Sequence, residues 1–102
     1  MSQYSRGTRK GLAEAIRLAN RALELDPTLS FVAALAGLCH TVNILLGFAT
    51  DPQFDRKEAV RFIRQASSID DGDPQTLATT AVVSAFILSD YEYSIELGSV
   101  PD

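Results

Sequence analysis

The feature that most constrains this chain is a 13-residue pattern that occurs twice. Residues 14–26 (EAIRLANRALELD) align without a gap on residues 58–70 (EAVRFIRQASSID). Each copy carries two alanines seven positions apart, which are Ala15 and Ala22 in the first copy and Ala59 and Ala66 in the second. Seven residues are two helical turns, so both alanines lie on one face and let another helix approach closely. The pattern therefore predicts an internally repeated stack of helices.

Apolar residues recur at helical spacing along most of the chain. Between positions 8 and 25, for example, Leu12, Ile16 and Leu23 fall on one face of a helix. The segment 29–47 is apolar nearly all round, which is typical of a helix buried on more than one side. This spacing predicts an all-α fold with about five helices, at about 8–25, 29–47, 54–69, 74–88 and 91–97.

Residues typical of helix ends and turns separate these segments. Short polar side chains cap helix N-termini, proline suits the first helical turn, and glycine or proline stops a helix. We therefore expect Thr8 and Asp90 to be N-caps, Asp73 and Pro74 to start the fourth helix, and Asp26–Pro27, Asp51–Pro52, Gly98 and Pro101 to mark turns or stops.

Composition points away from catalysis and from nucleic acid. The 102 residues are 46% hydrophobic and include one histidine, one cysteine and no tryptophan, which leaves little material for a metal or nucleophile site, and no cofactor is expected. The net charge is −4, and no basic residue follows position 70, so phosphate neutralisation would be weak. We expect a chain that is not an enzyme and binds no nucleic acid.

Two short motifs that could suggest metal binding have simpler interpretations. Cys39 and His40 are adjacent on a helix, so their side chains point about 100° apart and do not converge on one ion. Residues 70–73 (DDGD) lack the closing glutamate of a calcium loop, since the twelfth position is Ala81. Both motifs are interpreted as structural, and no metal site is expected.

Targeting signals are not visible in the sequence. The first ten residues contain no apolar core of a signal peptide, and polar residues interrupt the apolar stretch 29–49. A single cysteine suits a reducing compartment. We expect a cytoplasmic protein without a membrane partner.

The repeated pattern resembles the tetratricopeptide repeat, a helix–turn–helix unit of about 34 residues. The second helix of that repeat carries small residues where helices cross, followed by a proline at the turn. The positions that match, and that the resemblance assigns to packing between repeats, are Ala15, Ala22, Pro27, Gly37, Ala59, Ala66 and Ala81. The resemblance implies antiparallel helix pairs in a right-handed superhelix.

The chain departs from that repeat in its spacing. Ala15 and Ala59 are 44 residues apart, about ten more than the repeat allows, and the excess falls in residues 46–55. The chain is expected to be a single fragment, residues 1–102, of about two and a half repeats that begins on a second helix. It is also similar to the repeat regions of bacterial class III adenylate cyclases and related winged-helix regulators, which implies a place in a larger signalling protein.

In such repeats the first helix of each pair lines a concave groove. Here the lining positions would be Phe31, Ala34, Leu38, Thr41, Val42, Gln75, Ala78, Val82, Ala85 and Phe86. This largely apolar set suits a protein or peptide with an apolar or amphipathic helical face. We therefore expect a protein–protein interaction or scaffold module. Two alternatives stay open: a homodimerisation or spacer element, and a small-ligand sensor with a pocket between the second and fourth helices.

Overall fold

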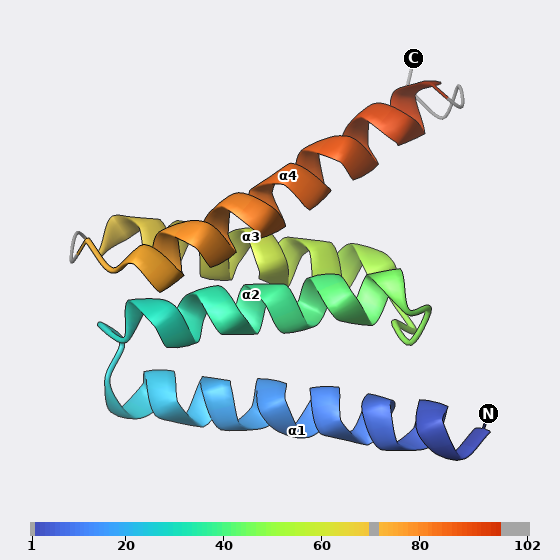
Figure 1. The fold of residues 1–102 in the computed structure, drawn as a ribbon, viewed down its shortest axis with the longest axis horizontal. Helices are drawn as coiled ribbons and strands as arrows, with labels where there is room; N and C mark the ends of the chain where they lie inside the picture. The colour runs from blue at the N-terminus through green and yellow to red at the C-terminus, as the bar shows by residue number, and fades with distance from the viewer. Residues whose placement is uncertain (1, 70–71, 97–102) are drawn as a thin grey trace.

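All regular structure in the described residues is helical. The computed structural model describes the backbone of residues 2–69 and 72–96 and the side chains of residues 7–69 and 72–89. The helices are α1 (Ser2–Leu25), α2 (Ser30–Leu45), α3 (Pro52–Ser68) and α4 (Pro74–Glu96). The chain turns back at each connection, and α4 rises away from the other helices toward its C-terminal end (Figure 1).

The prediction of about five helices is wrong by one, because α4 is continuous. The segments expected at 74–88 and 91–97 form a single helix that runs through Asp90 to Glu96. Aspartate costs a helix interior only about 0.7 kcal/mol relative to alanine, so without a neighbouring glycine or proline it does not end a helix. The predicted stops at Gly98 and Pro101 lie outside the described residues.

The start of α1 also differs from the prediction. The helix begins at Ser2, so Thr8 lies within it and is not an N-cap. A side chain that can cap a helix is also tolerated inside one at a small cost, and no proline precedes Thr8 to force a boundary. The first helix is therefore longer than its apolar periodicity indicated.

The turns rich in aspartate, proline and glycine form as predicted. The Asp73 carboxylate accepts hydrogen bonds from the Thr76 backbone N–H (2.9 Å) and hydroxyl (2.7 Å) at the start of α4. Asp51 accepts from the Phe54 backbone N–H (3.3 Å) and caps α3. Gly47, with φ of 75°, follows the end of α2 in a conformation that favours glycine.

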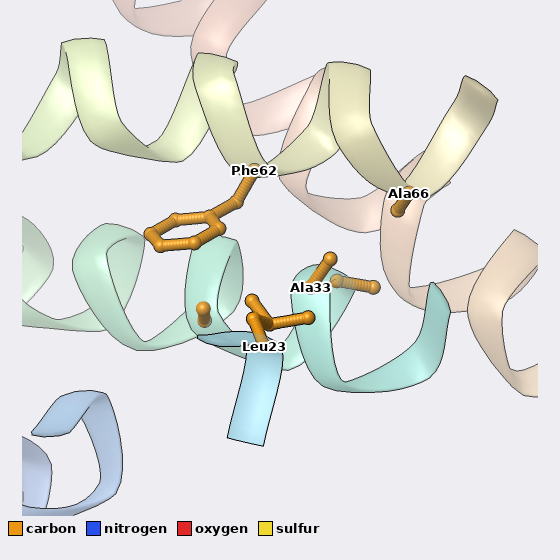
Figure 2. Close-up of a cluster of buried hydrophobic side chains, with 6 residues drawn as sticks. Leu23, Ala33, Phe62 and Ala66 are labelled. Carbon is orange, nitrogen blue, oxygen red and sulfur yellow. The ribbon is translucent and has the colours of Figure 1, made fainter. Parts of the chain in front are cut away.

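A core of small residues and one aromatic ring holds α1, α2 and α3 together. Phe62 on α3, which is 1% exposed, lies between that helix and α2, and Leu23 from α1 and Ala33 from α2 close the cluster (Figure 2). A Cβ atom on Gly37 would lie 3.3 Å from the Ala59 carbonyl oxygen. Helices α2 and α3 therefore approach as closely as their small residues permit.

Helix α2 is the centre of the molecule. It packs against α1, α3 and α4, as its nearly all-round apolar sequence predicts. A second cluster, formed by Ala59, Ile63 and Val83 with Leu38 and Ile87 beside it, joins α2 and α3 to α4. Among the described residues, α4 thus packs on α2 and α3 through the face that carries Val83 and Ile87.

Candidate functional site

The predicted groove residues are only partly available to a partner. Ala34 and Thr41 are buried in the helix packing at 0% and 1% exposure. The other eight are half-buried or exposed: Phe31, Leu38, Val42 and Phe86 are half-buried, and Gln75, Ala78, Val82 and Ala85 are exposed.

One cavity brings two of the predicted groove residues together. Phe31 and Gln75 line a hollow of about 620 Å³ between the N-terminal ends of α2 and α4. Beside it, the buried hydroxyls of Ser30 and Thr76 lie 3.2 Å apart in a hydrogen bond that joins these helices.

The residues assigned to packing between repeats have different environments. Gly37, Ala59 and Ala66 are buried where α2 meets α3. Ala15 and Ala22 are half-buried on α1, and Ala81 on α4 is exposed. The exposed Pro27 accepts a hydrogen bond from the Gln65 side-chain amide (3.2 Å) through its carbonyl oxygen.

A more continuous apolar hollow lies between α3 and α4, and the sequence did not predict it. Its volume is about 420 Å³, within the range of ligand and peptide pockets. We call it the α3–α4 groove, and its lining residues are Arg56, Val60, Ile63, Arg64, Ser84, Ile87 and Leu88. Apolar side chains form its floor, and the arginines belong to α3.

Basic side chains follow the α3 side of this groove. A neighbouring hollow of about 410 Å³ is lined by Val60 and four basic residues, Arg56, Lys57, Arg61 and Arg64. Arg61 is paired with Glu58 (2.7 Å), and this bond lowers the pKa of the Glu58 carboxyl, which stays charged. Lys57 and Arg64 are exposed. The groove edge therefore carries positive charge on a chain whose net charge is negative.

Helix α4 exposes an unusual amount of apolar surface. Leu77, Val82 and Leu88 are 64%, 60% and 60% exposed, and three alanines of the helix, Ala78, Ala81 and Ala85, are exposed as well. A helix this apolar is normally covered on most sides. Within the described part of the chain, no helix combines the length and apolarity needed to cross a bilayer. The exposed face of α4 is thus a candidate contact surface for another protein.

A buried histidine–carboxylate pair links α2 to the first turns of α3. His40 Nδ1 lies 2.6 Å from Asp55 Oδ1, and both residues are buried. The Asn43 side chain donates to the same carboxylate oxygen (3.3 Å). The His40 ring stacks on Phe62 at a centroid distance of 5.9 Å and meets Phe54 edge-on. The pair braces the two helices across the long connection that follows α2.

Open space lies beside this pair. A cavity of about 370 Å³ borders it, with Arg9 and Phe48 among the lining residues. Among the described residues, no group of three histidine, cysteine, aspartate or glutamate side chains could hold a metal ion. Burial raises the pKa of the Cys39 thiol, which makes the thiolate scarcer at neutral pH.

Comparison with known proteins gave no match: no family model, no curated protein and no solved structure is significantly similar to the chain. What the molecule does must therefore be inferred from its own geometry. Two features meet in one place: the apolar lining of the α3–α4 groove, which includes the exposed Leu88, and the basic residues of α3.

Proposed function

We propose that this chain is a protein-binding module whose α3–α4 groove takes up the apolar face of an amphipathic helix. The observation that carries the proposal is that Leu88 is 60% exposed and lines an apolar hollow with Val60, Ile63 and Ile87. Covering such a surface is favourable at about 25 cal/mol per Å² of apolar area. An extended hollow between two helices suits a third helix, which is a common mode of peptide recognition.

The charges around the groove select the partner. Arg64 lines the groove, Lys57 lines the neighbouring hollow, and both are exposed, so a helix with acidic residues beside its apolar face would pair with them. A helix with lysines at those positions would be repelled. The module is therefore specific for acidic amphipathic helices, and its affinity falls as salt screens these charges.

The arrangement of helices supports a tetratricopeptide-like origin for this module. Packing of α1 on α2, of α2 on α3 and α4, and of α3 on α4 is the set expected for successive antiparallel helix pairs. In a tetratricopeptide-like arrangement, α2 and α4 would each be the first helix of a repeat, and α1 and α3 would each be the second helix of a repeat. The module would serve, without catalysis of its own, as a cytoplasmic scaffold within a bacterial adenylate-cyclase-like signalling protein.

Two synthetic helices test the proposal directly. Both carry the same leucine face, and one has glutamates and the other lysines beside it. At low salt, fluorescence anisotropy should show the glutamate peptide binding at least about tenfold more tightly than the lysine peptide. Equal binding of both peptides, or binding of neither, would contradict the proposal.

Two matched variants place the binding on the molecule. Leu88→Glu puts a carboxylate into the groove and should abolish binding of the glutamate peptide. Leu77→Glu changes an equally exposed leucine of the same helix that does not line the groove, and should bind as the original chain does. Equal loss in both variants would place the binding elsewhere.

A further inference from the structure

An acidic helix end of the kind that would complement the basic residues of α3 is present in the chain itself. Asp90, Glu92 and Glu96 lie in the last two turns of α4, and no basic residue follows position 70. Glu92 and Glu96 follow Leu88 in the same helix. Leu88 itself lines the groove.

We propose that the occupant of the α3–α4 groove is the C-terminal half of α4 from a second copy of this chain, an inference that rests on the function proposed above. Helix α4 extends past the body of the molecule at that end (Figure 1). The acidic residues of one copy then approach Lys57 and Arg64 of the other.

Reciprocity favours a second copy over an unrelated acidic protein. The groove wall is built from Ser84, Ile87 and Leu88 of α4, the same helix that would enter the groove of the partner copy. When the α4 of one copy enters the groove of its partner, the α4 of the partner enters the groove of the first copy. The contact is therefore self-complementary and closes as a two-fold dimer. It also covers Leu88, which is 60% exposed and lines the groove.

Charge reversal on either side of the contact tests this arrangement. One variant carries Lys57→Glu and Arg64→Glu, and the other carries Glu92→Lys and Glu96→Lys. Sedimentation equilibrium should show a dimer for the original chain in the micromolar range. Each variant alone brings like charges together, and its dimerisation constant should weaken by at least about tenfold.

Mixing the two variants provides the decisive result. The groove of the first variant, now acidic, then meets the α4 of the second variant, now basic. The unchanged basic groove of the second variant meets the unchanged acidic α4 of the first. An equimolar mixture should therefore form a heterodimer as tight as the original dimer. Helical circular dichroism checks that each variant folds. A monomeric original chain, dimers that charge reversal leaves unchanged, or a mixture that stays monomeric would each overturn the inference.

The failure of this inference can be distinguished from the failure of the proposed function. If the original chain is monomeric but binds the glutamate peptide, the partner is a different acidic helix and the proposed function stands. If the chain neither dimerises nor binds that peptide, both proposals fail.

Discussion

At the scale of single residues, the buried pair of His40 and Asp55 is a polar contact that joins two helices. It holds the start of α3 against α2 with a distance of 2.6 Å between Nδ1 and Oδ1. The sequence offered no sign of it, because the two residues are separated by an irregular connection whose path depends on packing. A histidine on an apolar helix and an aspartate in the first turn of a helix are both common residues at such positions, so neither indicated a contact between them.

Removing the carboxylate of this pair should be costly. Asp55→Ala leaves His40 and the Asn43 amide without their buried acceptor, and the free energy of unfolding should fall by about 3–5 kcal/mol. Urea unfolding measures the change. Glu14→Ala, which breaks the exposed pair with Arg17, is the control and should leave stability nearly unchanged. Equal effects of the two substitutions would show that the buried pair does not brace the fold.

The single cysteine gives a pH-dependent prediction. Burial raises the pKa of the Cys39 thiol, so at mildly alkaline pH the folded chain holds less thiolate than the unfolded chain. Alkylation by iodoacetamide should therefore be several-fold slower in the native protein than in urea. By the same linkage, Cys39 favours folding below its unfolded pKa, and this contribution is lost as the pH rises through the folded pKa. Equal alkylation rates would contradict the burial of this side chain.

At the scale of helices, the close approach of α2 and α3 depends on Gly37. A Cβ atom there would lie 3.2 Å from Ile63 Cδ1 and 3.3 Å from the Ala59 carbonyl oxygen. The carbonyl oxygen belongs to the helix backbone, so it cannot move aside as a flexible side chain can. Gly37→Val should therefore lower the free energy of unfolding by about 1–3 kcal/mol.

Gly11 supplies the matched control for Gly37. It lies within α1, and a Cβ atom there would meet nothing within 4 Å. Gly11→Val should be neutral or slightly stabilising, because valine has a higher helix propensity than glycine. Thermal melts of the two variants compare them, and a similar melting temperature for both would rule out tight packing at Gly37.

Turn chemistry explains which helix boundaries could be predicted. Asp73 and Pro74 combine a side-chain cap with a residue that fits the first helical turn, and α4 starts there. Thr8 and Asp90 have side chains that can cap a helix, but no proline directly follows either of them, and both lie inside helices. A polar residue alone does not distinguish a helix end from a solvated helix surface.

At the scale of the whole molecule, the candidate site follows from how the helices cross. The apolar spacing of α3 and α4 could be read from the sequence, but the faces left open depend on α4 diverging from the other helices (Figure 1). The expectation from repeat positions placed the groove on α2 and α4, where Ala34 and Thr41 are buried. A separate hollow with basic residues at its edge lies between α3 and α4.

The measurement that tests the central claim most directly is a ¹H–¹⁵N NMR titration of the chain with the glutamate peptide. We expect the shifted amides to cluster at Val60, Arg64, Ser84 and Leu88, which line the α3–α4 groove. Shifts that cluster around Phe31 and Gln75, or no shifts at all, would contradict it.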